Sequence, residues 1–242
     1  MIPAGTYPIG HRLYPHSRPE HEVTLADYVI GEYAITNGQY SEFIAAGGYG
    51  DQSLWSEAGW RWQEHKQTIE PGLWHDPNFN HEWQPVVGVC WYEADAFAGW
   101  LTRESGLPWR LPSEVEWEAA ARGTEAEPFL NPAHINSVER GIDRTWGVMA
   151  GAGVTWCGAH DMLGNVWEWT SSRWGRNWQS LDYPYPYDPD DGREDPSGSY
   201  ARVMRGGSWF DPLSQAHPAN RARYLPGSRG SNIGFRLARS VH

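Results

Sequence analysis

The sequence has little lysine and little cysteine, and each shortage excludes a class of protein. Lys66 is the only lysine, and the net charge is −11. Because binding to nucleic-acid phosphates needs clustered basic residues, we expect no nucleic-acid partner. Cys90 and Cys157 are the only cysteines, too few for a disulfide scaffold. Cys90 lies in an apolar run, so we expect a buried small side chain rather than a nucleophile.

Long apolar runs are also absent. No stretch of the sequence is long and apolar enough to span a bilayer, and the opening residues 1–5 carry no signal-peptide pattern. We therefore expect a soluble, cytoplasmic protein without a membrane partner. The 242 residues, of which 40% are hydrophobic, suffice for a globular core.

Tryptophan, glycine and proline are abundant, at 16, 27 and 18 residues. Many glycines and prolines indicate many turns and irregular segments. Large aromatic rings fill the uneven spaces of such a fold, so we interpret most tryptophans as core residues. The alternative is that some of them form a platform on which sugars stack.

Three helices are predicted from apolar spacing and from their ends. The first begins near Thr36 and stops at Gly47-Gly48. The second contains residues 94–101 and ends at Gly106. The third opens with a capping box of Ser113 and Glu116 and ends at Gly123.

The remaining residues predict short strands and long loops. Residues 23–35 are typical of short strands, residues 49–83 of a loop, and residues 84–90 of a short apolar strand or turn. No repeat or linker divides the chain, so we expect one α+β domain over residues 1–242. Residues 183–199 are predicted to be a surface loop with a solvated acidic face of Asp188, Asp190, Asp191, Glu194 and Asp195.

One segment near the end combines scaffold-like ends with an irregular middle. It reads RGGSWFDPLSQAHPANRARYLPGSRGSNIGFR and spans residues 205–236. A Gly-Gly turn opens it and Gly234-Phe235-Arg236 closes it, while the middle has neither helical nor strand periodicity. A rigid frame around a loop that tolerates substitution is what a recognition surface needs.

Four motifs in order strongly resemble the formylglycine-generating-enzyme (sulfatase-modifying factor) domain family. They are QPVVGVCWYEADAFAGWL at 84–101, WRLPSEVEWEAAARG at 109–123, DMLGNVWEWT at 161–170, and RVMRGGSW…NIGFR at 202–236. The opening residues are also similar to the start of that domain. The resemblance implies a single α+β domain of the C-type-lectin-like kind, with few helices and much irregular structure.

The family contains an oxidase that acts on sulfatase cysteines and binds copper through two cysteines. The matching positions here are Asp211 and Ala216, and neither supplies the soft sulfur ligand that copper(I) prefers. Another branch, of ergothioneine-type sulfoxide synthases, uses iron held largely by histidines of a further helical domain. The histidines of this chain are scattered, so we expect neither copper nor iron.

The resemblance also implies structural calcium. Its main site would use the carboxylates of Asp161 and Glu168 and the carbonyls of Gly164 and Val166. Oxygen ligands of this kind suit calcium. The alternative is a simple turn into a strand, with Glu168 hydrogen-bonded. A second, looser match falls on Asn136, Ser137, Glu139 and Ile142.

A further branch of the fold family comprises the variable proteins of diversity-generating retroelements, in which an error-prone reverse transcriptase changes adenine-rich codons. Segment 205–236 resembles their variable region, because only Gln215 between Phe210 and Ile233 lies outside the amino acids that a randomised AAC codon yields. Arg221, Pro226 and Arg229 would be framework. The candidate variable, ligand-binding residues are Phe210, Asp211, Pro212, Ser214, Ala222, Arg223, Tyr224, Leu225, Gly227, Ser228, Gly230, Ser231, Asn232 and Ile233.

Two function classes follow from these observations. The first is a non-catalytic protein that binds an unknown protein, small molecule or glycan through segment 205–236, either as a variable protein or as an unspecialised family member. The second is a metal-dependent oxidase or oxygenase of the formylglycine-generating or sulfoxide-synthase class. The replaced cysteine pair favours the binding protein.

Overall fold

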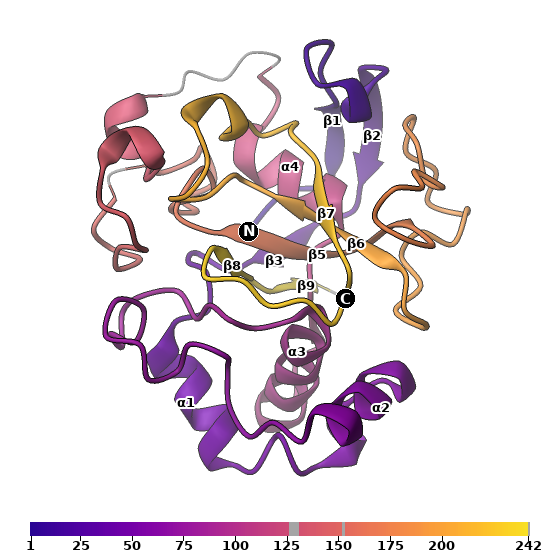
Figure 1. Cartoon of the computed structure of the whole chain (residues 1–242). Helices are drawn as coiled ribbons and strands as arrows, with labels where there is room; N and C mark the ends of the chain where they lie inside the picture. Colours follow the sequence, from indigo (N-terminus) through magenta and orange to yellow (C-terminus); the bar gives the residue numbers. More distant parts are fainter. Residues whose placement is uncertain (126–130, 152, 242) are drawn as a thin grey trace.

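The computed structural model describes residues 1–125, 131–151 and 153–241 (Figure 1). Its strands form three small sheets. The largest has the order β7 (Ala222–Tyr224), β6 (Ala201–Arg205), β5 (Trp167–Gly175) and β8 (Ile233–Gly234). The second has the order β3 (Tyr28–Ile30), β9 (Ala238–Ser240) and β4 (Trp109–Arg110), and the third pairs β1 (Gly5–Ile9) with β2 (His21–Leu25).

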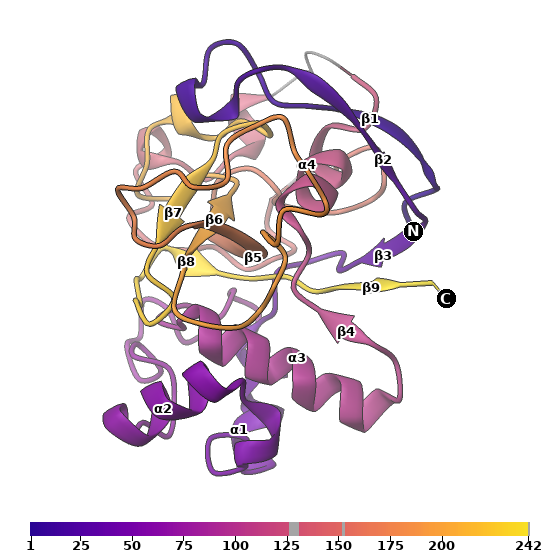
Figure 2. The ribbon, with the colours of Figure 1, turned by 90° about the vertical axis from the view of Figure 1, so that its right-hand side faces the viewer.

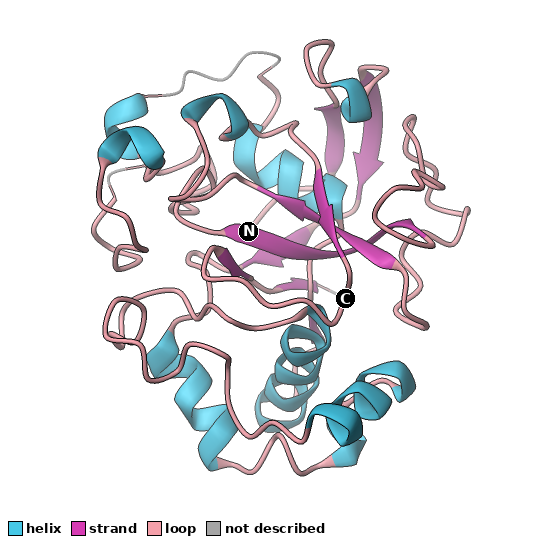
Figure 3. Cartoon of the chain, viewed as in Figure 1, coloured by secondary structure: helices cyan, strands magenta, loops and turns pink. Residues whose placement is uncertain are grey.

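Helices lie on both sides of these strands. Figures 1 and 2 show α1 (Asn37–Ala45), α2 (Glu57–Lys66) and α3 (Trp91–Ser105) together on one side and α4 (Glu114–Arg122) on the other. Short 3-10 turns occur at Pro15–Ser17, Gln52–Leu54, Pro132–His134, Val138–Arg140 and Leu213–Gln215. Much of the remaining chain is loop (Figure 3). Among the described residues, no helix is long and apolar enough to cross a membrane.

The three predicted helices are confirmed as α1, α3 and α4. Thr36 and Ser113 each form a complete capping box, and Gly106 adopts the left-handed conformation, with φ of 69°, that ends α3. Residues 84–90 are buried as an apolar run, yet they pair with a strand-like neighbour only at the isolated bridge between Thr36 and Pro85.

The prediction of a loop over residues 49–83 is wrong in part, because α2 lies within it. The Ser56 hydroxyl caps this helix by accepting a hydrogen bond from the Gly59 backbone N–H. Gly59 lets the helix approach α3, since a Cβ there would lie 3.3 Å from Tyr92. The polar composition of α2 hides its amphipathic character, and its position depends on packing against α3.

Tryptophan fills the core as predicted. Trp91, Trp117 and Trp169 are buried, and each indole N–H has a partner: the Thr170 carbonyl at 2.8 Å, Glu168 at 2.7 Å and the Val89 carbonyl at 3.3 Å. Buried indoles need such partners because an unpaired N–H costs free energy. Cys90 is also buried, and burial raises the pKa of its thiol, which confirms its interpretation as a small core residue.

The acidic loop at 183–199 is exposed at Asp188, Asp190, Asp191 and Asp195, as predicted, but Glu194 is partly buried. Glu194 accepts hydrogen bonds from the hydroxyls of Ser171, Ser172 and Tyr187. Asp191 pairs with Arg193, and Asp195 pairs with Arg173. These partners come from β5 and from the loop itself, so part of the acidic cluster anchors the loop to the large sheet.

Four ion pairs connect arginines of the last third of the chain to glutamates of earlier elements. Arg221 contacts Glu114 and Arg205 contacts Glu118, both on α4, while Arg236 contacts Glu168 on β5. All six of these side chains are buried. The fourth pair joins Arg229 to Glu93 on α3, with the arginine partly exposed.

These pairs are well satisfied by further hydrogen bonds. Glu118, for example, also accepts from Arg122 at 2.8 Å and from the Gly10 backbone N–H at 2.9 Å. Desolvating two charges is costly, and removing one partner of a buried pair leaves the other uncompensated. The four pairs therefore fix where the C-terminal segment lies on α3, α4 and β5.

We expect Glu118→Gln to destabilise the fold by about 3–5 kcal/mol, because Arg205 and Arg122 would stay buried without a carboxylate. Urea denaturation followed by circular dichroism measures this change. The matched control is Glu57→Gln, which breaks the exposed pair with Arg61 and should cost less than about 1 kcal/mol. Equal costs for the two variants would contradict a structural role of the buried pairs.

Candidate ligand-binding surface

Both ends of segment 205–236 are held by the same strand. β6 leads into the segment and pairs antiparallel with β5, whereas β8 near its end pairs parallel with β5 through Ile233 opposite Trp167. Gly206 and Gly207 make the opening turn with φ of 107° and 78°, a region that favours glycine. A Cβ on Gly206 would lie 2.9 Å from the Met162 carbonyl oxygen. The chain between these ends is therefore a loop with fixed anchors.

Three of the predicted framework residues tie the segment to the rest of the fold. Arg221 and Arg229 form two of the ion pairs described above. Pro226 is buried, and its carbonyl accepts the Trp91 backbone N–H at 2.9 Å, at the start of α3. The middle of the segment is thus tied down at intervals to both helical sides of the molecule.

Most of the candidate variable residues lie at the surface. Phe210, Tyr224 and Leu225 are 64%, 50% and 42% exposed. Pro212 and Ser214 are exposed as well. The partly exposed members are Asp211, Ala222, Arg223, Gly227, Ser228, Gly230, Ser231 and Asn232.

Four candidates have contacts that limit their variation. Ile233 is 5% exposed and packs in the core, so its side chain does not face a ligand. Gly227 faces Trp62, where a Cβ would lie 2.7 Å from the indole nitrogen. Asn232 donates to the Ser208 hydroxyl at 3.1 Å.

The fourth such candidate is Asp211, one of the two positions that the resemblance matches to the oxidase's cysteines. Its carboxylate accepts a hydrogen bond from the Trp167 indole at 2.8 Å and another from the Ser208 hydroxyl. Ala216, at the other cysteine position, is buried. Asp211 therefore closes the opening turn onto β5, and these two side chains supply no sulfur for copper.

A cavity of about 520 Å³ opens beside β7, lined by Trp178, Arg223, Tyr224, Leu225 and Ser228. Four of these five residues belong to the predicted ligand-binding set. The Arg223 Nε–H donates to the Trp178 carbonyl at 3.0 Å, and its guanidinium lies 4.8 Å from the centre of the Trp174 ring. The size lies in the range of small-molecule sites.

Trp178 is the functional candidate that the sequence analysis missed. It lies in the loop that follows β5, and 51% of its surface is exposed. An exposed tryptophan beside a cavity is a usual mark of a binding surface. The sequence contains sixteen tryptophans, and only the fold separates exposed rings such as Trp83, Trp156 and Trp178 from the buried ones.

The residues of the main predicted calcium site have different surroundings. Both Glu168 oxygens are engaged, by Arg236 and by the Trp117 indole. Asp161 is 5% exposed, and its oxygens lie beside the Trp146 indole without a hydrogen bond of good geometry. Burial raises the pKa of Asp161 to about 7, although nearby Arg236 lowers it. The Gly164 carbonyl accepts the Val166 backbone N–H at 2.8 Å.

The second predicted calcium set lies beside the first, because Asn136 and Gly164 form a parallel bridge. The Asn136 side-chain oxygen is buried without a partner among the described residues. Glu139 accepts the Ser137 hydroxyl at 2.7 Å and the Leu213 backbone N–H at 3.0 Å, which ties it to segment 205–236. Ile142 is half-buried.

Within residues 1–125, 131–151 and 153–241, no three histidine, cysteine, aspartate or glutamate side chains gather in a way that could hold a metal ion. Asp161 is therefore the one strong acidic ligand of the predicted calcium sites whose oxygens are unused in that part of the chain. Any cation there would depend on carbonyl and amide oxygens for its other ligands.

Comparison with known proteins gives relatives of two kinds. A family model of the sulfatase-modifying factor enzyme 1-like domain matches residues 1–241. Hercynine oxygenase of Mycolicibacterium thermoresistibile is 33% identical over 93% of this chain and 54% of the oxygenase. The formylglycine-generating enzyme of Thermomonospora curvata is 29% identical over 98% of this chain and 91% of the enzyme. The chain spans little more than half the length of the hercynine oxygenases that it matches.

A solved structure adds the second kind of relative. Treponema denticola variable protein 1 matches with a TM-score of 0.71 and 25% identity, over 98% of this chain and 93% of that one. Enzymes and a variable protein thus share this fold, so the fold alone does not decide the function. The chain belongs to the sulfatase-modifying factor enzyme 1-like domain family, that of the formylglycine-generating enzymes, and has its C-type-lectin-like α+β fold.

Proposed function

We propose that this protein is a non-catalytic ligand-binding protein whose recognition surface is the exposed part of segment 205–236. One observation carries the proposal: Arg223, Tyr224, Leu225 and Ser228, all expected from the sequence to contact a ligand, line one cavity. They lie on and after β7, between anchors at Arg221 and Arg229. Loops held in this way present side chains without contributing much to folding.

The chemistry of the cavity suits a ligand with a flat or apolar face and polar groups. Tyr224 and Trp178 offer aromatic surfaces, and Leu225 adds an apolar one. Arg223 forms no ion pair with a carboxylate among the described residues, and only its Nε–H is engaged. Its remaining N–H groups are donors for a carbonyl, hydroxyl or anionic group of the ligand. A glycan, a small molecule or a protein loop presents such groups.

The resemblance to a variable protein supports a further part of the proposal, that a retroelement diversifies the segment. Positions such as Phe210 and Tyr224, exposed on a fixed backbone, tolerate many side chains. Gly227 and Ile233 would stay constant, because a larger or polar side chain there disturbs the core. Sequencing the flanking DNA tests this. A reverse-transcriptase gene and a near-copy of codons 205–236 with adenines at the varied positions would support it, and their absence would contradict it.

The triple variant Tyr224→Ala, Leu225→Ala, Ser228→Ala should lose binding of hits from a fragment library of glycosides and aryl carboxylates, screened by ligand-observed NMR. Because these side chains are at the surface, the free energy of unfolding should change by about 0.5 kcal/mol per site or less. By contrast, Phe235→Ala should cost about 3–5 kcal/mol, since its ring is fully buried.

The control for this experiment is Leu107→Ala, an exposed leucine just after α3 outside the cavity lining. This variant should still bind every fragment that the wild type binds. If the triple variant unfolds as readily as Phe235→Ala, the segment is core and the proposal fails. Hits that survive in the triple variant would likewise place binding elsewhere.

We expect no conversion of the cysteine in a sulfatase-type peptide to formylglycine, with or without added copper. The reason is that Asp211 and Ala216 stand where the family oxidase has its cysteines, and Asp211 is engaged by Trp167. Mass spectrometry of the peptide measures the outcome. Loss of the thiol with gain of an aldehyde would contradict the expectation.

The alternative function is a metal-dependent oxygenase, favoured by the 33% identity to a hercynine oxygenase. Elemental analysis of the protein purified without added metal distinguishes the two. Iron or copper near one ion per chain would favour the oxygenase, and calcium alone would favour the binding protein.

We further propose that calcium binds at Asp161, whose unpartnered buried oxygens fit a hard cation. Without the ion, the raised pKa means that the folded state holds the proton more tightly than the unfolded one. Stability should therefore fall as pH rises from about 4 to above 7. The rise in the pKa of Asp161 from 3.8 to about 7 corresponds to a loss of at most about 4 kcal/mol in the free energy of unfolding.

In a calcium chelator at pH 8, Asp161→Asn should melt at a higher temperature than the wild type, and the difference should vanish near pH 4. Adding calcium at pH 8 should raise the melting temperature of the wild type only, because an ion bound by the folded state stabilises it. Differential scanning calorimetry measures both. No response of the wild type to calcium would remove the ion from the proposal.

A further inference from the structure

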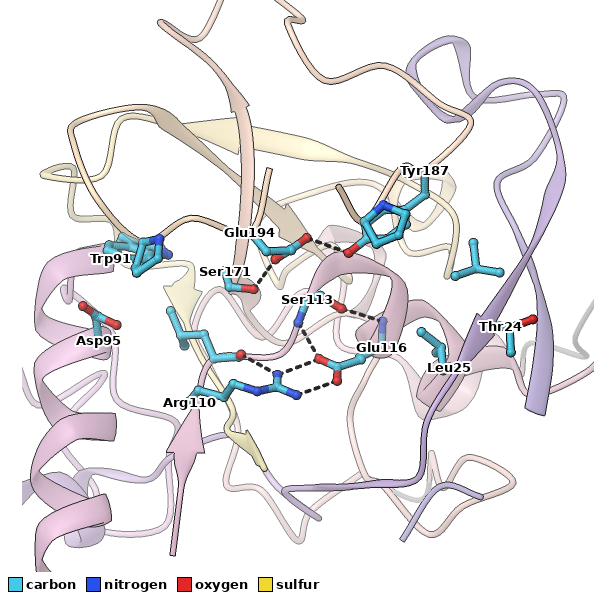
Figure 4. Close-up of a pocket in the computed structure, with 14 residues that line it drawn as sticks. Thr24, Leu25, Trp91, Asp95, Arg110, Ser113, Glu116, Ser171, Tyr187 and Glu194 are labelled. Carbon is cyan, nitrogen blue, oxygen red and sulfur yellow. Dashed lines mark hydrogen bonds and ion pairs between the residues drawn. The ribbon is translucent and has the colours of Figure 1, made fainter. Parts of the chain in front are cut away.

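A second cavity lies where six parts of the fold meet, and none of its lining residues belongs to segment 205–236. Its volume is about 460 Å³, within the range of small-molecule sites. Figure 4 shows its walls: β2, the first half of α3, β4, the start of α4, β5 and the loop at 183–199. Its chemistry is therefore independent of the proposed recognition surface.

Most polar groups on these walls already have partners. Arg110 and Glu116 form a two-point ion pair with N–O distances of 2.7 Å and 2.6 Å. Glu194 accepts from the hydroxyls of Ser171 and Tyr187. Figure 4 shows these bonds joining neighbouring wall residues. These side chains build the walls and have little capacity left for a ligand.

Asp95 is the exception. This half-buried residue of α3 lines the cavity and has no hydrogen bond or ion pair with any described residue. Burial raises the pKa of its carboxyl to about 6, and the Arg202 guanidinium offsets this only in part. Arg202 directs its N–H groups elsewhere, to the Ser171 and Pro196 carbonyls at 2.6 Å and 2.9 Å. An unpaired, desolvated carboxylate is unfavourable until a cation or donor meets it.

Apolar side chains form the other part of the walls. Val23 and Leu25 come from β2, Leu111 follows β4, and Trp91 lies one helical turn before Asp95. Residues four apart on a helix share a face, so the indole and the carboxylate belong to one wall. The β2 residues lie on the other side of the cavity in Figure 4. The site thus combines one unsatisfied acid with apolar surfaces.

We propose that this cavity binds a small organic cation, an amine attached to an aromatic or branched apolar group, with its ammonium on Asp95. Charge favours a cation over an anion, because Glu116 neutralises Arg110, and Arg202 is the one further cation that faces both Asp95 and the Glu194 carboxyl, whose pKa burial raises. The net charge of −11 also attracts cations to the surface. The apolar walls accept the body of the ligand, as in most small-molecule sites.

Isothermal titration calorimetry with phenethylamine at pH 7.5 tests the proposal. The wild type should bind this amine at millimolar concentration or below, while 3-phenylpropionate, an anion of similar shape, should not bind. Asp95→Asn should weaken amine binding by at least about tenfold, because a charged hydrogen bond is lost. Glu104→Gln removes an exposed charge from the same helix and should leave the affinity unchanged.

Three results would overturn the proposal: no binding of phenethylamine to the wild type, an unchanged affinity in Asp95→Asn, or an equal loss in Glu104→Gln. A crystal structure of the wild type with the amine tests the site without relying on a variant that could fail to fold. It should place the ammonium nitrogen within hydrogen-bond distance of Asp95, and another location would contradict the assignment. Since Tyr224 and Leu225 do not touch this cavity, the outcome is independent of that for the recognition surface.

Discussion

The pairing of buried arginines with buried glutamates is the constraint on which the C-terminal half of this protein depends. Arg205, Arg221 and Arg236 are spread along the last 40 residues, yet each ends on a carboxylate of α4 or β5. An unpaired charge in the core costs several kcal/mol. A shift of the segment along the sheet would break more than one pair at once, so only one placement satisfies all of them. Irregular backbone can be held in this way without long strands or helices.

This arrangement separates the parts of the segment that specify the fold from those that face solvent. The anchors recur at Arg221, Pro226 and Arg229, and the exposed residues lie between them. Tyr224 projects from β7 while Arg221, directly before that strand, points into the core. Neighbouring positions therefore differ in their contribution to folding, and a substitution at an exposed position need not disturb a buried anchor. A binding surface benefits from this separation whether its exposed residues are constant or diversified.

The sequence predicts those features that depend on local chemistry. The capping boxes of α1 and α4 and the glycine after α3 lie within a few residues of what they cap, so their helices could be placed in advance. Features that depend on distant partners could not. Glu168 was expected to bind calcium, because nothing near it in the chain reveals that Arg236 takes its oxygens. Likewise α2 and the anchoring role of Glu194 come from contacts across the fold.

The contrast between acids with and without a partner also bears on where ligands could bind. Four glutamates on α3, α4 and β5 pair with arginines, and aspartates nearer the surface, such as Asp51 and Asp182, pair with Arg103 and Arg176. Asp95 and Asp161 are desolvated, and neither forms an ion pair within the described residues, although the Trp146 indole lies beside Asp161. In both, burial raises the carboxyl pKa, so each lowers stability when ionised. A fold that satisfies its other buried acids so completely has no structural need for these two. The two proposals would give each charge a partner: a metal ion among oxygens at Asp161, and an amine between apolar walls at Asp95.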